Sequence, residues 1–200
     1  AYEIRLSLVG SEMCIRDSNR GWWWRQGIDM ITIREDIQET HTFSLLVDNE
    51  AGVLARVIGL FSGRGYNIES LTVAEVDKDS HTSRITIVSK GSPKTIDQIK
   101  RHLERLVPVH KVTDLTIEGP SVEREMALIK VLYTNESKEE ILRLVEIYRA
   151  KIVDTTDKSF VFELTGAMDK INSFIDLLRP LGLKDISRTG LAAIARGSKN

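Results

Sequence analysis

The sequence predicts an α+β protein of two small domains, the first of which is a ferredoxin-like βαββαβ unit. Two hundred residues leave room for one large domain or two small ones. From His41 to Ile117, four stretches of strand-like residues are separated by two stretches with apolar residues at helical spacing. The order strand, helix, strand, strand, helix, strand suits two helices on one face of a four-stranded antiparallel sheet. After Gly119 and Pro120 a similar order of segments follows.

The first strand and helix have the clearest patterns. Apolar residues occupy alternate positions from Phe43 to Val47, as in a strand with one buried face. An apolar stripe at helical spacing follows, formed by Val53, Val57, Leu60 and Phe61. Gly63 and Gly65 are expected to end this helix.

We place the first domain at 39–118. Turn residues and prolines predict the limits of its remaining strands and of its second helix. The expected elements are strands over 68–76, 84–88 and 111–117, with a polar hairpin turn over 77–80. Ser92 followed by Pro93 signals a helix start, because proline is tolerated in the first helical turn. Pro108 is expected to end that helix.

We predict a linker over 119–125 and a second α+β domain over 126–197. Ser137 and Glu140 are expected to form a capping box at the start of its first helix. The other expected elements are strands over 127–133, 151–155, 160–164 and 183–188, and a last helix that ends near Pro180. Because the order of the first domain partly repeats, this domain is expected to be ferredoxin-like as well.

Residues 1–38 do not follow these patterns. The three neighbouring indoles of Trp22–Trp24 cannot all face one core. The basic start and cleavage site of a secretory signal are missing, and Glu12 and Asp17 are unlike a transit peptide. The stretch resembles translated library or adapter sequence, so we predict a non-family leader that is disordered or artefactual, with Met30 as a candidate start. An aromatic docking arm is the alternative.

Composition argues against several classes of protein. The 28 basic and 29 acidic residues give a net charge of −1, whereas a general nucleic-acid binder usually has a basic excess. No apolar run approaches the length of about 18 residues that a membrane span needs. The single cysteine, Cys14, excludes an internal disulfide and a multi-cysteine zinc site. The four histidines share no ligand spacing, so no metal site is predicted and each is read as a surface or strand-end residue.

No catalytic set is indicated. The serines lack a G-x-S-x-G elbow, no P-loop is present, and Gly63-Arg64-Gly65 lacks the third glycine of a dinucleotide site. RNA-recognition modules share the βαββαβ order but stack bases on aromatic residues of the two central strands. Here the first strand offers only Phe43 and the third strand offers none, so RNA binding is disfavoured.

The turn from Asp48 to Leu54 is the strongest candidate for a binding site. A strand that runs through a short turn into a helix leaves N–H groups unpaired, and these groups and the helix dipole attract a carboxylate. Gly52 allows a ligand to approach the backbone closely. Asn49 and Asn67, at the two ends of this unit, offer amide groups. A purely structural reading, in which Asn49 caps the turn and Gly52 fits a tight backbone, explains the pattern equally well.

Two motifs resemble the ACT domain of the small, regulatory subunit of acetolactate synthase (acetohydroxyacid synthase). The motifs are Asp48-Asn49-Glu50-Ala51-Gly52-Val53-Leu54 and Gly63-Arg64-Gly65-Tyr66-Asn67-Ile68-Glu69-Ser70. The likeness continues through Val122-Glu123-Arg124-Glu125 and Arg188-Thr189-Gly190 to Ala195-Arg196-Gly197. It therefore extends from residue 40 to residue 197.

In ACT regulatory domains this turn forms an amino-acid pocket together with the start of the second strand of a partner subunit. The resemblance therefore implies a homodimer that binds valine at its interface, with the carboxylate on N–H groups of residues 52–54. The implied contacts are Asn49, Gly52, Val53 and Leu54 from one chain and Asn67 and Ile68 from the other. Ala51 departs from a commonly polar position. An apolar slot separates ligands that differ by one methylene by about 1–3 kcal/mol, so valine is expected to bind better than leucine or isoleucine.

The resemblance also implies a function. The chain is expected to be a cytoplasmic subunit without a catalytic site, which activates the catalytic large subunit and confers feedback inhibition by valine in valine, leucine and isoleucine synthesis. Thiamine diphosphate, Mg and FAD are expected only in the large subunit, so no cofactor is expected here. A stand-alone ACT amino-acid sensor that regulates another enzyme or transcription is the alternative, and an independent enzyme is the third reading. The motifs at 122–125 and 188–197 favour the synthase.

Overall fold

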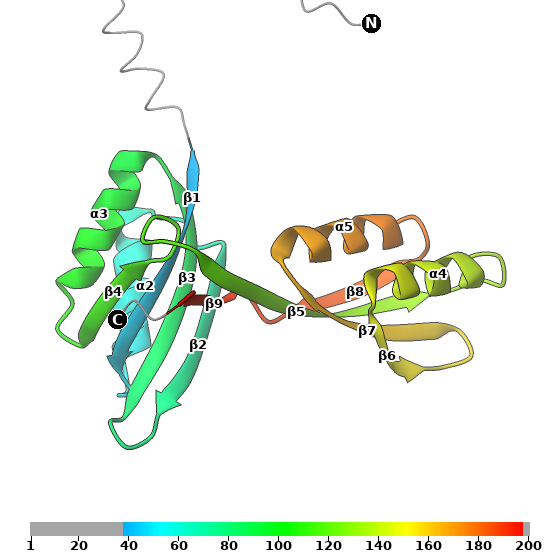
Figure 1. The fold of residues 1–200 in the computed structure, drawn as a ribbon, viewed down its shortest axis with the longest axis horizontal. Coiled ribbons are helices and arrows are strands. Elements are labelled where there is room, and N and C mark those ends of the chain that lie inside the picture. The colour runs from blue at the N-terminus through cyan, green and yellow to red at the C-terminus, as the bar shows by residue number, and fades with distance from the viewer. Residues whose placement is uncertain (1–37, 198–200) are drawn as a thin grey trace, which may run out of the picture. The chain divides into compact units, whose positions relative to one another are not determined.

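The N-terminal domain of the computed structural model, which describes residues 38–197, is a four-stranded antiparallel sheet with two helices on one face (Figure 1). The strand order is β2-β3-β1-β4, which is the order of a ferredoxin-like fold. The elements are β1 (Glu39–Asp48), α2 (Val53–Arg64), β2 (Ser70–Asp77), β3 (Thr82–Gly91), α3 (Pro93–Glu104) and β4 (Val109–Asp114). The predicted βαββαβ order is confirmed, whereas the prediction for residues 1–38 lies, but for Gln38, outside the described residues.

The core of this domain lies between the sheet and the two helices. Phe43, Leu45 and Val47 of β1 are at most 1% exposed, as their alternation predicts. They pack with the buried stripes of α2 and α3, which include Val57, Phe61, Ile99 and Leu103. Each fully buried apolar side chain contributes about 1.5–3 kcal/mol. These contacts hold α2 on the sheet and thereby fix both of its ends.

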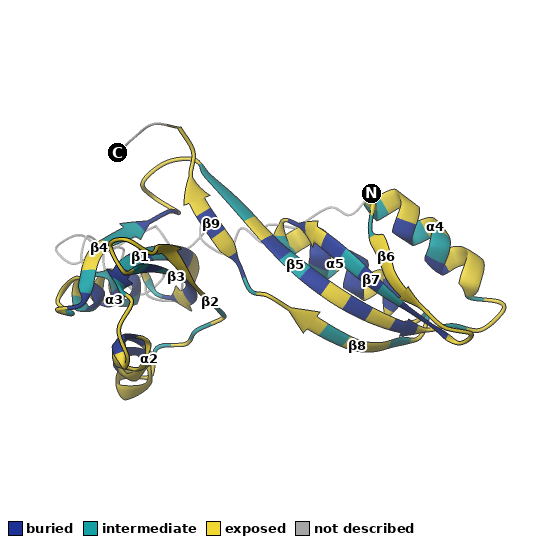
Figure 2. Cartoon of the chain, turned by 90° about the horizontal axis from the view of Figure 1, so that it is seen from below, coloured by how far each residue is buried: buried dark blue, intermediate teal, exposed yellow. Residues whose placement is uncertain are grey.

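The C-terminal domain has the same topology. Its elements are β5 (Ser121–Leu132), α4 (Lys138–Tyr148), β6 (Lys151–Thr155), β7 (Ser159–Gly166), α5 (Met168–Leu178) and β8 (Leu183–Arg188). The order β6-β7-β5-β8 repeats that of the first sheet, so the expectation of a second ferredoxin-like domain is confirmed. Buried and exposed residues alternate along β5 (Figure 2), with Ile129 and Val131 in a core that also contains Phe162 and Phe174.

β5 begins inside the predicted linker. Residues 121–124 are the first part of this strand and pair with β9 (Ala192–Ala195), a strand that the sequence analysis did not predict. The charged run Glu123-Arg124-Glu125 hides the strand pattern, although Glu125 itself is 4% exposed. Of the predicted linker 119–125, only Gly119, with its φ of 135°, and Pro120 lie outside β5.

Two predicted boundaries are wrong for local reasons. β4 spans Val109–Asp114 and ends where the Asp114 carboxylate accepts a hydrogen bond from the Thr116 N–H at 3.1 Å, which turns the chain. α3 ends at Glu104, well before Pro108. The carbonyl of Pro108 instead accepts the Asp48 N–H at 3.0 Å.

The helix starts show one correct and one wrong prediction. Ser92 caps α3, and its Oγ accepts the Thr95 N–H at 3.3 Å, with Pro93 in the first turn. The capping box at α4 does not form, because Ser137 has helical angles and its Oγ accepts the Thr134 N–H at 3.0 Å. No helix within residues 38–197 is both long enough and apolar enough to cross a membrane.

Candidate functional site

The turn between β1 and α2 is open at Gly52. This residue caps α2 with φ 88° and ψ −9°, in the left-handed region that favours glycine. Apart from its chain neighbours, no described residue has an atom within 4 Å of the position where a Cβ would stand, so the space beside the backbone is free. The conformation therefore both requires glycine and leaves room for a ligand.

Of the three N–H groups that the sequence predicts to be free, at residues 52–54, only that of Val53 has an acceptor among residues 38–197. The Val53 N–H donates to the Glu50 carbonyl at 3.3 Å, and the Arg56 N–H donates to the Gly52 carbonyl at 3.0 Å. Within residues 38–197, neither the Leu54 nor the Ala55 N–H has an acceptor before the helix. The N–H groups that are free to bind a ligand are therefore those of Gly52, Leu54 and Ala55. Ala55 was missed because the position of the first helical turn was not known.

The side chains of the turn differ in what they offer a ligand. Val53 is 4% exposed and belongs to the core, so it presents neither its side chain nor a free N–H. Leu54 is 37% exposed and offers an apolar surface. Asn49 donates from Nδ2 to Glu75 Oε1 at 3.1 Å, which ties the turn to the end of β2. The Asn49 Oδ1 has no partner among the described residues and can accept a hydrogen bond.

Asn67 and Ile68 lie at the opposite end of α2. Gly65 caps that end with φ 68°, and the Ser89 Oγ donates to the Asn67 carbonyl at 2.7 Å. Asn67 is exposed, and Ile68 is partly buried against the core. Because α2 has 12 residues, its ends are about 18 Å apart. One chain therefore does not bring the two groups of predicted residues together.

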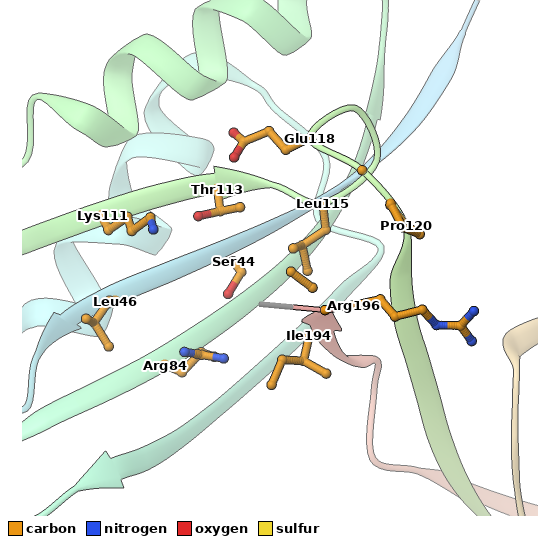
Figure 3. A pocket seen from close by; sticks show the side chains of 13 residues that line it. Ser44, Leu46, Arg84, Lys111, Thr113, Leu115, Glu118, Pro120, Ile194 and Arg196 are labelled. Carbon is orange, nitrogen blue, oxygen red and sulfur yellow. The ribbon is translucent and has the colours of Figure 1, made fainter. Parts of the chain in front are cut away.

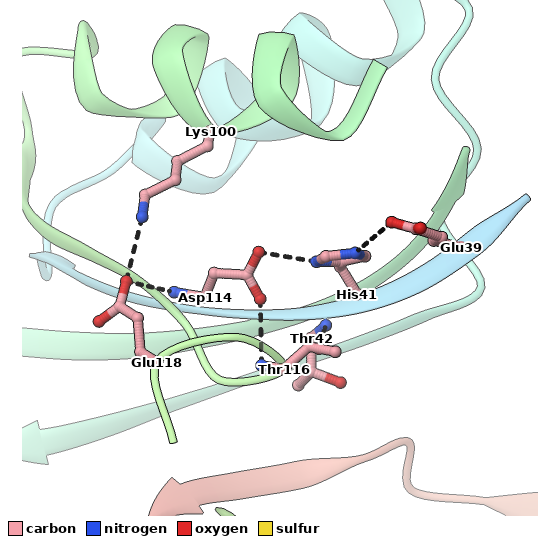
Figure 4. Close-up of polar contacts among 7 residues, drawn as sticks. All are labelled: Glu39, His41, Thr42, Lys100, Asp114, Thr116 and Glu118. Atoms are coloured by element: carbon pink, nitrogen blue, oxygen red, sulfur yellow. Dashed lines mark hydrogen bonds and ion pairs between the residues drawn. The ribbon is translucent and has the colours of Figure 1, made fainter. Parts of the chain in front are cut away.

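A network of polar contacts joins β1 to β4 at a place that is separate from this turn (Figure 4). The ring of the buried His41 is hydrogen-bonded on both sides. Its Nδ1 lies 2.7 Å from Asp114 Oδ2, and its Nε2 lies 3.3 Å from Glu39 Oε2. Both ring nitrogens thus face carboxylates, which leaves neither free to act as a base toward a substrate. The network is structural. His41 was predicted to be a surface or strand-end residue; it is buried, so it is not a surface residue, but it lies only two residues after the start of β1.

The Glu118 carboxylate extends this network. Its Oε1 accepts from Lys100 Nζ at 3.0 Å and from the Asp114 N–H at 3.1 Å. Burial alone would raise the pKa of Glu118, but these hydrogen bonds and the charges of Lys100 and Lys111 lower its pKa overall. The contacts with Lys100 and with the Asp114 N–H therefore favour the ionised carboxylate.

A cavity of about 620 Å³ lies elsewhere, and its lining includes none of the six predicted site residues (Figure 3). Its walls are formed by the sheet face that carries Ser44 and Arg84, by the turn at Gly119, and by residues 194–197. The free Gly52 turn and this cavity are thus two separate features.

Comparison with known proteins assigns both domains. Residues 43–111 match the AHAS small subunit-like ACT domain, and residues 124–197 match the small subunit of acetolactate synthase. A probable acetolactate synthase small subunit from Archaeoglobus fulgidus is 48% identical over 159 residues, which are 80% of this chain and 98% of the relative. The chain belongs to the acetolactate synthase small-subunit family.

Other members of the acetolactate synthase small-subunit family agree with this assignment. The small subunit from Haemophilus influenzae is 46% identical over 78% of this chain and 96% of its own length. The crystal structure of the small subunit from Thermotoga maritima superposes with a TM-score of 0.72 at 44% identity, covering 80% of this chain and 99% of that one. The resemblance derived from the turn motifs is therefore confirmed.

Proposed function

We propose that this family member is the non-catalytic, regulatory subunit of a cytoplasmic acetolactate synthase, and that it activates the catalytic large subunit. We further propose that valine binds at a homodimer interface and inhibits the complex as an end product of branched-chain amino acid synthesis. Thiamine diphosphate, Mg and FAD would belong to the large subunit. The names of the relatives, which are small subunits of this synthase, support the assignment of the partner.

The main support for an effector site shared by two chains is the distance between its two groups of residues, which lie at opposite ends of α2. Asn49, Gly52 and Leu54 lie at the start of the helix, and Asn67 and Ile68 lie at its end. About 18 Å separates these ends, whereas a free amino acid spans only a few ångströms. A site that uses both groups therefore has to draw them from two chains.

The open edge of β2 offers a way to join two chains. Among the described strands, β2 pairs only with β3, so its other edge presents unpaired backbone groups. Val73 and Val76 on this strand are 42% and 51% exposed. In an antiparallel pair of β2 strands, the start of one strand lies beside the end of the other. Since Glu75 near the end of β2 holds Asn49, that arrangement would bring Asn67 of the second copy to the Gly52 turn.

The chemistry of the turn fits an α-amino acid. The ligand carboxylate would accept from the Leu54 and Ala55 N–H groups, with support from the dipole of α2. Its ammonium group would donate to the free Asn49 Oδ1. The branched side chain would lie between Leu54 and Ile68 of the second copy, and one extra methylene would change its affinity by about 1–3 kcal/mol.

A contact between the domains could carry the effect of the ligand to the rest of the subunit. The Leu191 N–H, which precedes β9, donates to the Ser70 Oγ at 2.9 Å. Ser70 opens β2, two residues after Ile68. A ligand regulates only if it binds one arrangement better than another. We propose that β2 shifts with the ligand and that the Leu191 contact passes this shift to β9 and β5.

Assays of the matched large subunit test this proposal. We expect the chain to raise large-subunit activity and to make it sensitive to valine. Asn49→Ala and Asn67→Ala should each keep the activation and lose most of the inhibition. Asn135→Ala, which changes an exposed asparagine before α4, is the matched control and should behave like the wild type. If the chain did not activate the large subunit, the assignment of function would fail. If both variants kept full valine sensitivity, the assigned site would be wrong.

A further inference from the structure

The cavity of about 620 Å³ lies on the face of the N-terminal sheet opposite its helices (Figure 3). Because side chains alternate along a strand, Ser44 and Leu46 face away from the core that contains Phe43 and Leu45. The volume is within the range of about 300–1,000 Å³ that is usual for small-molecule sites. Ile194 and the residues after it close one side of the cavity. The cavity is thus large enough for a metabolite-sized ligand.

Two cations face this cavity from the same row of the sheet. Arg84 on β3 and Lys111 on β4 both pair with Leu46 on the intervening strand β1. Strands two positions apart are about 10 Å apart, a distance that the long side chains of Arg84 and Lys111 can bridge to hold one small anion between them. Ser44 and Thr113, paired in the next row, add hydroxyl groups. Two neighbouring rows of the sheet therefore present hydrogen-bond donors to the cavity.

Neither cation is in a direct ion pair with another described residue, although the charge of Lys111 acts on Glu118. No ion pair or hydrogen bond to the side chain of Arg84 or Lys111 is present within residues 38–197. The carboxylate in the lining, Glu118, is already held by Lys100 and by the Asp114 N–H. Arg196 also lines the cavity, but its guanidinium points away from the other labelled side chains (Figure 3). The inner surface therefore keeps a net positive charge.

Arg84 carries the decisive feature. Its Nε is buried and has no hydrogen-bond partner in the described structure. A buried charged donor without an acceptor is costly, and an oxyanion is the acceptor that a guanidinium binds best. The apolar part of a ligand would contact Leu46, Leu115 and Ile194, which line the same cavity.

We propose that this cavity binds a small anionic molecule through a carboxylate or phosphate group held by Arg84 and Lys111. The site is distinct from the proposed valine site, with which it shares no residue. Because Ile194–Gly197 form one wall, a bound ligand would also stabilise the packing of the C-terminal segment on the sheet. The chain would then have two small-molecule sites.

An NMR titration of the full ¹⁵N-labelled chain tests the proposal with two probes, succinate and inorganic phosphate, at constant ionic strength. We expect at least one probe to give saturable shifts of the Arg84 Nε–Hε signal and of the Ser44 and Thr113 amides. A response to succinate alone assigns a carboxylate ligand, and a response to phosphate alone assigns a phosphate ligand. Because valine is absent, the result does not depend on the proposed effector site.

Charge-matched variants complete the experiment. Arg84→Gln and Lys111→Gln should each weaken the binding about tenfold or more, because each removes a charged hydrogen bond. Arg143→Gln removes one positive charge from the exposed face of α4 and should leave the affinity unchanged. Lys111 is exposed, so its variant is expected to fold even if the Arg84 variant does not. The absence of saturable shifts with both probes, or equal weakening by all three variants, would overturn the proposal.

Discussion

Arg188 joins two of the segments that resemble the family, 122–125 and 188–190, because its side chain binds Glu125. Its guanidinium donates from Nε to Glu125 Oε1 at 2.7 Å and also contacts Oε2, while Nη1 donates to Asn172 Oδ1 at 2.9 Å. The hydrogen bond from Arg188 to Glu125 raises the pKa of the arginine, although its partial burial acts in the opposite direction. Glu125 is 4% exposed, so losing the arginine would leave a buried carboxylate unpaired. The pair fixes β8 on β5.

Glu118 makes the stability of the fold depend on pH. Because its pKa in the folded chain lies below the ordinary value of 4.5, Glu118 contributes stability above pH 4.5, and this contribution is lost as the pH falls through the folded pKa. We expect the wild type to be more stable than Glu118→Gln at neutral pH, and this difference to shrink below pH 4.5. Urea unfolding at a series of pH values measures it. A difference that stays constant or grows in acid would contradict the assignment.

At the scale of elements, the sequence is informative where a side chain acts on its own neighbours. The alternation from Phe43 to Val47 and the Ser92-Pro93 helix start both depend on local geometry, and both are observed. Ser137 has the same local signal, but its Oγ is taken by Thr134 in the preceding loop. β9 was missed because its sequence, Ala-Ala-Ile-Ala, has little intrinsic preference for a strand and forms only against β5.

Gly190 controls how the connection from β8 to β9 packs on β2. It has φ 82°, and a Cβ there would lie 2.9 Å from both the Ser70 Oγ and the Thr72 Oγ1. We expect Gly190→Ala to lower the free energy of unfolding by about 1–2 kcal/mol from the backbone alone, and by more because of the contact. It should also reduce the valine response, because the Leu191 contact to Ser70 would shift.

Gly197→Ala is the matched control for that prediction. Gly197 has φ 85°, but no atom of a described residue beyond its chain neighbours lies within 4 Å of its Cβ position, so its variant bears the backbone cost without the contact. Thermal and urea unfolding of the two variants measure the difference. If Gly190→Ala were no more destabilising than Gly197→Ala, the packing of this connection on β2 would not have the role described.

At the scale of the whole molecule, the fold was predictable and the site was not. Each domain buries stripes that can be read along one chain, so the βαββαβ order follows from the sequence. The candidate site depends instead on where the ends of α2 lie. The resemblance assigned Asn49 and Asn67 to one site shared by two chains, and the structure adds that the 12 residues of α2 lie between them. It also shows that Val53 faces the core, as the apolar stripe of the helix predicts, whereas the resemblance gave the same residue as a ligand contact.

The claim that two chains build each valine site can be tested with mixed dimers. Asn49→Ala and Asn67→Ala chains carrying different tags are combined, and the mixed dimer is purified. In this dimer, one site combines both substitutions and the other combines the two wild-type asparagines. If instead each chain built its own site, every site of the mixed dimer would carry one substitution.

Titration calorimetry of the mixed dimer with valine is the most direct measurement. We expect one site of wild-type affinity per mixed dimer, two such sites in the wild-type dimer, and none in either parent variant. A mixed dimer that binds valine as weakly as both parents would contradict the shared site.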